Sequence, residues 1–296
     1  MRILSKTASG STNIRKTLEK SEKLSIYYHD LFDYPLTFSD LIKWNVSKTF
    51  ISENDELSIS YQNNFYFLKG REGLIYKRVL RERISVKKME IAKRASRALS
   101  IIPTILMVGV TGSLAMNNAV DGSDIDLMII TKKGTLWTTR LLSYFLLCTL
   151  RYALRRPFDK VQKGKLCLNM WMDETDIVWK NRDRNIYTAH EIAQVLPLVN
   201  KNKSYEKFIS KNKWIQNFWP NSVRISSKNQ VAGSRQTKKV MIRDTFHLLR
   251  SLVEKIAYKF QYLYMKNKIS REVVTPTRAI FHPKDLSKIV VSHLDS

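Results

Sequence analysis

VGVTGSLAM at residues 108–116 and DGSDIDLMII at residues 121–130 decide how the middle of this chain folds. A buried strand is expected over 104–110, and it enters a Gly-Ser turn from which a short helix starts over 113–117. A second strand is expected over 125–131. Free backbone N–H groups and the hydroxyl of Ser113 would then point outward beside Gly112, which is an arrangement that suits a phosphate.

Two aspartates follow this turn on the second strand. Asp124 and Asp126 lie two residues apart, so their carboxylates share one face of the strand. Two carboxylates on one face can hold Mg²⁺, and two such ions would neutralise a triphosphate while activating an attacking oxygen. The alternative is a surface turn with two solvated aspartates. Against it, apolar residues flank Asp126, where an unpaired carboxylate would be costly.

The residues around this motif alternate between strand and helix patterns. A largely buried helix is expected over 137–154 and a third strand over 166–172. This alternation indicates a core of the α+β or α/β class over residues 101–180. A basic amphipathic helix over 73–100 is expected to connect this core to the N-terminal part.

The N-terminal part is expected to form a winged-helix-like module over residues 16–72, after a mobile tail at 1–15. A helix over 14–31, a short helix capped by Thr37 or Ser39 and a helix-like piece over 46–53 precede a β-hairpin with an Asn-rich turn. This order is typical of winged helix-turn-helix modules, which often read DNA with the last helix. Acidic residues after that helix disfavour phosphate contacts, so a structural or protein-contact role stays equally open.

Residues 181–296 are expected to form a helical C-terminal region. A polar linker is expected over 221–237, followed by one long helix over 240–266. Apolar residues recur along this helix at a spacing that places them on one stripe: Ile242, Phe246, Leu249, Leu252, Val253, Ile256 and Phe260.

The charge of the chain is strongly positive. With 51 Lys+Arg against 26 Asp+Glu, the formal net charge is +25, and the excess lies in the first and last thirds. Such a charge favours polyanionic partners, nucleic acid and nucleoside triphosphates among them, although a solvated basic face is the alternative. Residues 71–97 carry ten basic and three acidic residues, and residues 201–213 and 228–239 form two more basic clusters. A nucleic-acid acceptor would therefore be held by the flanking modules more than by the core.

Membrane insertion and secretion are not expected. The longest apolar run, Leu141 to Leu150, is about half of the roughly 20 residues that cross a bilayer. No secretory signal pattern opens the sequence. Cys148 and Cys167 lack metal-ligand spacing and are expected to be buried free thiols, so the expected location is the cytoplasm.

The central motif carries a family resemblance. Gly112-Ser113 followed by Asp124-x-Asp126 on a strand resembles the signature of the DNA polymerase β-type nucleotidyltransferase superfamily over roughly residues 100–175. The chain also resembles a family of bacterial and archaeal nucleotidyltransferase-domain proteins, through Phe-Asp-Tyr-Pro-Leu at 32–36 and Phe-His-Pro-x-Asp at 281–285. The resemblance implies a nucleotidyltransferase-fold core sheet flanked by a winged-helix-like module and a helical C-terminal region.

The resemblance also implies a reaction, namely transfer of a nucleoside monophosphate from an NTP to an acceptor with release of pyrophosphate. Gly112 and Ser113 would hold the triphosphate, while Asp124 and Asp126 would bind two Mg²⁺ ions. Further nucleotide-binding candidates are Ser123, beside the aspartates, and Lys132, after their strand. Lys133 and Arg140 are candidates to reach the nucleotide or its acceptor.

One position departs from the superfamily pattern. Its third carboxylate, usually the general base, corresponds here to Asn169, and an amide can ligate a metal but cannot take a proton at neutral pH. Asp173 shares the strand face but lies about 13 Å further along. Two hypotheses follow: a nucleotidyltransferase that works with a weak base, or a regulator that binds nucleotide or nucleic acid without turnover.

The remaining candidates have simpler interpretations. His247 lies four residues after Arg243 on the long helix, and a core or surface histidine is the interpretation we prefer. His282 and Asp285 resemble a helix-start cap beside a packed aromatic residue.

Overall fold

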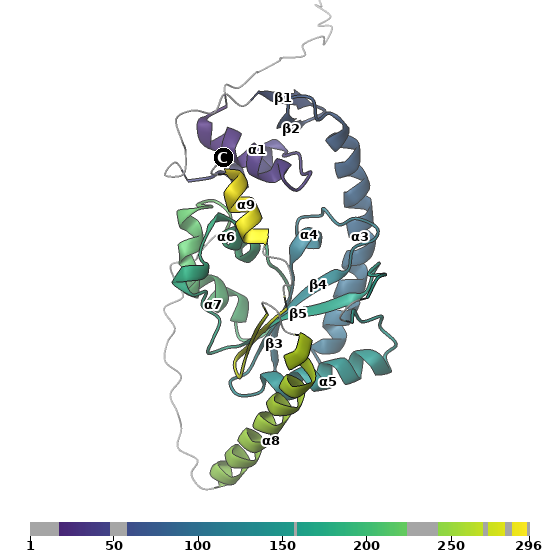
Figure 1. Cartoon of the computed structure of the whole chain (residues 1–296), viewed down its shortest axis with the longest axis vertical. Coiled ribbons are helices and arrows are strands. Elements are labelled where there is room, and N and C mark those ends of the chain that lie inside the picture. The colour runs from purple at the N-terminus through teal and green to yellow at the C-terminus, as the bar shows by residue number, and fades with distance from the viewer. Residues whose placement is uncertain are drawn as a thin grey trace, which may run out of the picture.

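A six-stranded mixed sheet forms the centre of the computed structural model, which describes residues 18–47, 58–156, 159–223, 242–268, 272–281 and 286–294 (Figure 1). The strands lie in the order β6 (Leu196–Asn200), β3 (Ile105–Val110), β4 (Ile125–Thr131), β5 (Leu166–Asp173), β8 (Arg278–Ile280) and β7 (Val273–Thr275). Among the described strands, β4 and β5 run parallel and the other neighbours pair antiparallel. The general α+β class is therefore confirmed, and so are the three core strands expected from the sequence.

Helices cover both faces of this sheet. One face packs against α3 (Gly73–Leu99), α5 (Leu136–Thr149) and α8 (Ile242–Met265), in a core that includes Leu99, Val108, Leu127 and Trp137. The other face packs against α1 (Lys20–Asp30), α6 (Ile186–Ala193), α7 (Ser204–Lys211) and α9 (Leu286–Leu294), in a core that includes Tyr28, Met128, Phe208 and Trp219. Alternate residues of each strand supply the two cores, as the two-residue period of a strand requires.

The N-terminal module matches its expected hairpin and its first two helices. Strands β1 (Ile59–Gln62) and β2 (Phe65–Leu68) pair antiparallel. Thr37 is the N-cap of α2 (Phe38–Lys43), and its side chain accepts from the backbone N–H of Asp40. The helix-like piece expected over 46–53 falls mostly outside the described residues, as does the tail at 1–15. Trp44 packs in the same core as the sheet residue Met128. The module thus shares a core with the sheet.

Arg71, just before α3, and basic residues of α3 hold this module in place. Arg71, Lys77 and Arg81 all form ion pairs with Asp33, whose backbone is left-handed at φ 53°. Arg78 is buried and donates to the Pro35 carbonyl at 3.1 Å. Part of the basic pattern at 71–97 therefore serves internal contacts instead of an external polyanion.

The C-terminal region differs from the expected helical arrangement. Strands β6, β7 and β8 all come from residues 181–296 and join the central sheet. Short 3₁₀ turns at Asn181–Asp183, Lys213–Asn217 and Lys266–Lys268 complete the region. Periodicity missed these strands because they are three to five residues long.

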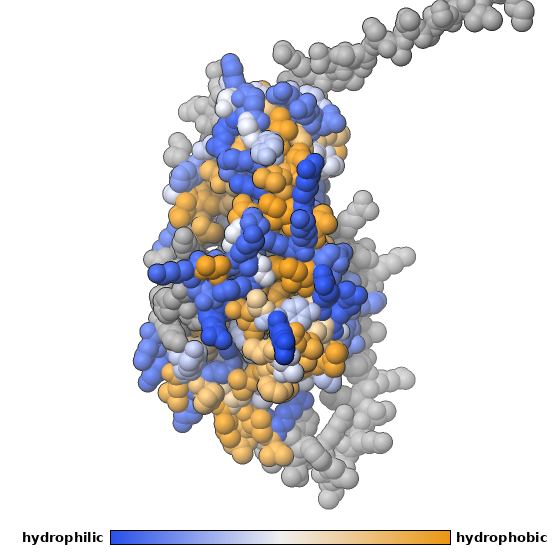
Figure 2. Space-filling model, turned by 90° about the vertical axis from the view of Figure 1, so that its right-hand side faces the viewer, coloured by the Kyte–Doolittle hydropathy of each residue, from blue (hydrophilic) through white to orange (hydrophobic). Residues whose placement is uncertain are grey.

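The described part of the apolar stripe of α8, from Leu249 to Phe260, faces outward. The buried side of α8 combines apolar Ala257 and Met265 with polar Glu254 and Gln261. Glu254 accepts from the backbone N–H of Trp137 at 2.6 Å and of Thr138 at 3.0 Å, so a carboxylate caps the N-terminus of α5. Leu252, Ile256 and other stripe residues remain about half exposed. Figure 2 shows apolar side chains gathered at the lower end of the molecule, where Figure 1 places α5 and α8.

Two further expectations were wrong on the same side of the sheet. Helix α5 was expected to be largely buried, yet Leu142 and Phe145 are exposed. Cys148 at its end is exposed, whereas Cys167 is buried as expected. Within the described residues, no helix is both long and apolar enough to span a bilayer.

Candidate functional site

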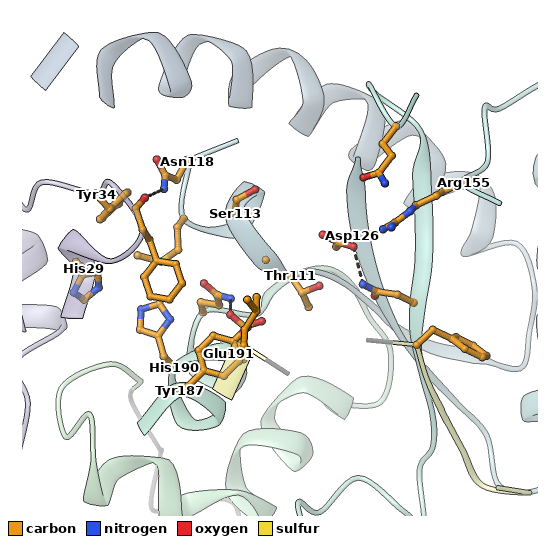
Figure 3. Close-up of a pocket in the computed structure, with 18 residues that line it drawn as sticks. His29, Tyr34, Thr111, Ser113, Asn118, Asp126, Arg155, Tyr187, His190 and Glu191 are labelled. Atoms are coloured by element: carbon orange, nitrogen blue, oxygen red, sulfur yellow. Dashed lines mark hydrogen bonds between the residues drawn. The ribbon is translucent and has the colours of Figure 1, made fainter. Parts of the chain in front are cut away.

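A cavity of about 470 Å³ lies where the Gly-Ser turn, the sheet and α6 meet (Figure 3). Thr111, Gly112 and Ser113 line it from the turn that leads into α4 (Gly112–Ala115). Asp126 and Asn169 line it from β4 and β5. The structure therefore brings four of the predicted site residues to one cavity: Gly112, Ser113, Asp126 and Asn169.

Gly112 makes the close approach between turn and strand possible. Its φ is +61°, and a Cβ at this position would lie 3.0 Å from Oδ2 of Asp126. The backbone N–H of Thr111 donates to the Asp126 carbonyl at 3.1 Å. Only glycine combines this left-handed backbone with the space beside the carboxylate, which explains why the turn contains it.

An acidic cluster lies on the strand side of the cavity, which it lines through Asp126. Three atoms that could bind a metal lie within 4.8 Å of one another, one each from Asp124, Asp126 and Cys167. Arg155 donates to Oδ2 of Asp124 at 2.6 Å. The amide of Asn169 donates to Oδ1 of Asp126 at 2.6 Å. These contacts engage one oxygen of each carboxylate.

A bulge sets the position of Asn169. Asp126 pairs with Cys167 and Met128 with Met170, so β5 has one residue more than β4 between these pairs. The extra residue brings the Asn169 side chain beside Asp126. Asn169 thus lies beside Asp126 at the acidic cluster, where it supplies an amide and no third carboxylate.

Burial and like charge raise the pKa of Asp126. Its environment excludes water, and the neighbouring carboxylate of Asp124 adds repulsion, while Arg155 acts in the opposite direction. Burial also raises the pKa of Cys167, and both aspartates add to the rise. Cys167 is therefore a thiol, which is a poor metal ligand.

The donor set of the cluster fits Mg²⁺. Magnesium prefers oxygen ligands, and Asp124 and Asp126 supply carboxylate oxygens. The Oδ1 atom of Asn169 is buried and has no hydrogen-bond partner among the described residues. A buried acceptor without a donor is costly, and a cation beside it would remove that cost.

Helix α6 adds residues that sequence analysis missed. Tyr187, His190 and Glu191 line the cavity from this helix. Gln194 follows the helix and donates to Oε1 of Glu191 at 2.6 Å. Burial, and next the charge of Asp126, raise the pKa of Glu191 to about 7. The available signal was a His-Glu pair within an apolar helical segment, but sequence alone did not place that segment opposite the aspartates.

Aromatic and imidazole rings close the far side of the cavity. Phe32 and Tyr187 have ring centroids 6.4 Å apart with planes 23° from parallel. The ring centroids of His29 and His190 are 5.2 Å apart, and burial lowers the pKa of both imidazoles. Both imidazoles are therefore neutral at pH 7, and the Nε2 atom of each has no partner within the described part of the chain.

Two predicted nucleotide-binding residues lie elsewhere. The hydroxyl of Ser123 donates to the Val120 carbonyl at 2.9 Å and accepts from Lys88 at 2.9 Å, so it stabilises the loop before Asp124. Lys132 lies past the end of β4, six residues after Asp126, which corresponds to about 20 Å of extended chain. Neither residue is among those that line the cavity. The contacts of both residues with a nucleotide stay predictions, and the cavity lining gives them no support.

The other candidates have structural roles or fall outside the described residues. Asp173 accepts from the backbone of Gly134 at 2.5 Å and of Thr175 at 2.8 Å, so it stabilises a turn instead of the site. Lys133 is exposed beyond β4, and Arg140 donates to Gln261 at 2.6 Å. His282 and Asp285 lie outside the described residues, as does the side chain of His247.

Comparisons with protein-family models, with curated proteins and with solved structures found no match. Any function assigned to this cavity therefore depends on its residues and on the sequence motif.

Proposed function

We propose that this protein is a Mg²⁺-dependent nucleotidyltransferase whose central sheet has the nucleotidyltransferase fold. The observation that carries the proposal is the cavity itself, where the Gly-Ser turn lies against Asp126 beside Asp124 and the unpartnered oxygen of Asn169. An oxygen-rich cation site next to a glycine turn suits the charged end of a nucleoside triphosphate.

Each part of the site has a defined task under this proposal. Gly112 and Ser113 contact the triphosphate, and Asp124, Asp126 and Asn169 hold the metal. Mg²⁺, when bound, neutralises phosphate charge and stabilises the attacking and leaving oxygens. Arg155 forms an ion pair with Asp124 at 2.6 Å and is close enough to the cavity to bind a phosphate oxygen instead.

The acceptor that we propose is a nucleic acid held outside the core. Several basic residues of α3 form internal contacts, but others are exposed on the same helix and can meet a phosphate backbone: Arg83, Lys87, Arg94 and Arg97. Binding by such a surface weakens steeply with salt, because phosphate contacts release counterions. Insensitivity of RNA and DNA binding to salt would exclude this surface.

A second candidate function is a nucleotide-binding regulator without turnover. The observation that favours it is Asn169, since an amide beside Asp126 can help to bind a metal but cannot accept the proton of an attacking hydroxyl. This candidate predicts Mg²⁺-dependent nucleotide binding in the absence of any transfer.

The two candidates are separated by incubation of the protein with labelled ATP, CTP, GTP or UTP, Mg²⁺ and total RNA. The Asp124→Asn/Asp126→Asn double variant is expected to lose Mg²⁺-dependent binding and transfer. The matched control is Asp121→Asn, because Asp121 lies in the same loop but is 65% exposed and pairs with Lys163. Equal transfer by wild type and double variant would exclude the enzyme, and binding without transfer would favour the regulator.

A further inference from the structure

We propose that Glu191 is the proton acceptor for the attacking hydroxyl, in place of the carboxylate that β5 lacks. This inference rests on the proposed transferase function. It adds a catalytic residue from α6, outside the sequence motif, and it removes the main chemical objection to activity, which is the amide at Asn169.

Glu191 is placed for this role by the packing of α6. Ile186, Ala189 and Ile192 pack in the core beneath the sheet, which fixes the helix against the face that carries the aspartates. Figure 3 shows Glu191 pointing into the cavity from this helix, on the side opposite Asp126. A hydroxyl group that enters the cavity would therefore lie between the metal-binding carboxylates and Glu191.

A neighbouring side chain orients the carboxylate. Gln194 Nε2 donates to Oε1 of Glu191 at 2.6 Å, and Gln194 itself is buried. A donor to one oxygen favours the charged form and leaves the other oxygen for a substrate proton. Gln194 is thus a positioning residue for Glu191.

The other cavity residues are less suited to accept a proton. The amide of Asn169 has no basic atom at neutral pH. Burial lowers the pKa of His29 to about 4, and the pKa of His190 also lies well below its usual value. Asp126 accepts from Asn169 and is proposed to hold the metal. Glu191 is the remaining carboxylate that lines the cavity within the described residues.

The charged and titratable groups around Glu191 come from several elements. Asp126 faces it from β4, Arg155 lies across the cavity, and Tyr28 of α1 interacts with it electrostatically. Tyr187 and His190 lie on its own helix. Burial is the larger cause of the raised pKa of Glu191, and the charge of Asp126 is the second.

The proposed step balances in atoms and charge. The acceptor hydroxyl gives its proton to the Glu191 carboxylate, and its oxygen forms a bond to the α-phosphorus of the NTP. The bond between the α-phosphorus and the oxygen that bridges to the β-phosphorus breaks, and pyrophosphate leaves with the electron pair. The protonated carboxyl group then returns its proton to water or to the leaving pyrophosphate.

The test compares wild type, Glu191→Gln and Glu206→Gln for two readouts: Mg²⁺·NTP binding and transfer of α-label. Glu206 is the matched control because it lies on α7 and bonds to the exposed side chain of Asn200. Glu191→Gln is expected to bind Mg²⁺·NTP within about threefold of wild type but to transfer label roughly 10²–10⁴-fold more slowly. Glu206→Gln should match wild type in both.

Each other outcome overturns either the role of Glu191 or the proposed function. Transfer by Glu191→Gln at the wild-type rate overturns the role of Glu191 and leaves the transferase intact. Binding without transfer in wild type overturns the role and favours the regulator. Absence of Mg²⁺-dependent NTP binding in wild type overturns the proposed function itself.

A second variant tests the base through its pH profile. Gln194→Leu removes the donor to the charged carboxylate, so the pKa of Glu191 and the rising limb of the pH–rate profile should move to higher pH. A limb that stays at the wild-type pH in Gln194→Leu overturns the assignment of Glu191.

Discussion

The side-chain amide of Asn169 donates a 2.6 Å hydrogen bond to Oδ1 of Asp126. A third carboxylate at this position would instead face the carboxylate of Asp126 directly. The amide therefore stabilises the buried carboxylate of Asp126 by donating to it. The Oδ1 atom of Asn169 has no partner among the described residues and is available to bind a cation.

Asn169→Asp should destabilise the metal-free protein by about 1–3 kcal/mol, because a buried donor becomes a third negative group. Mg²⁺ should recover this loss, so the unfolding temperature of the variant should rise more with Mg²⁺ than that of wild type. Asn169→Leu is the control, since it loses the hydrogen bond without adding charge and should gain no more from the metal than wild type does. Equal Mg²⁺ responses of wild type and Asn169→Asp would contradict the cation site.

Gly112→Ala should abolish Mg²⁺·NTP binding. The new Cβ would lie 3.0 Å from Asp126 Oδ2 in a left-handed backbone, and it would displace the turn from the carboxylate. Gly134→Ala is the matched control, because Gly134 has a similar φ of +63° but nothing within 4 Å of its Cβ position. Both variants should lose about 1 kcal/mol of stability to backbone strain, but binding by Gly134→Ala should be unchanged. Equal binding by the two alanine variants would show that the turn does not contact the ligand.

Lys88→Met should loosen the loop that carries the aspartates. The ammonium of buried Lys88 donates to the carbonyls of Val120 at 2.7 Å and Ser123 at 2.5 Å. Loss of these bonds leaves acceptors unsatisfied, so urea unfolding should show a loss of about 2–3 kcal/mol. Lys87→Met, one residue earlier and exposed, should change stability by less than about 0.5 kcal/mol. A similar stability for both variants would contradict this role of Lys88.

Acid should destabilise the protein through buried His29. Because burial lowers its folded pKa to about 4 from 6.5, the unfolded chain takes up a proton first as pH falls. The contribution of His29 is complete above pH 6.5 and is lost between about pH 6.5 and 4, at up to about 1.4 kcal/mol per pH unit. His29→Phe removes this dependence, so the difference in unfolding free energy between wild type and variant should change across that window. A constant difference from pH 7 to pH 4.5 would show that His29 is not buried in neutral form.

Local sequence patterns were sufficient for the core strands and for the central motif. Continuous apolar runs predicted β3, β4 and β5. Asp124 lies just before β4, and its carboxylate lies within 4.8 Å of that of Asp126. The Gly-Ser turn was equally local, because a left-handed residue followed by a helix start leaves few alternatives to glycine.

The opposite wall of the cavity depends on tertiary contacts. Glu191 and His29 lie more than 60 residues from Asp126 along the chain, and nothing in their neighbourhoods indicates that α6 and α1 cover the same sheet face. The side of α8 that packs in the core also depends on a tertiary contact, because Glu254 is buried where it caps α5 while the stripe residues from Leu249 to Phe260 stay exposed.

Transfer of label from α-labelled and γ-labelled NTP, with Mg²⁺ and total RNA, tests the central claim most directly. The account predicts that the α-label enters the acceptor, that the γ-label is released as pyrophosphate, and that Asp126→Asn abolishes both. Transfer of the γ-label instead, or α-label transfer that persists in Asp126→Asn, would contradict a nucleotidyltransferase site at these residues.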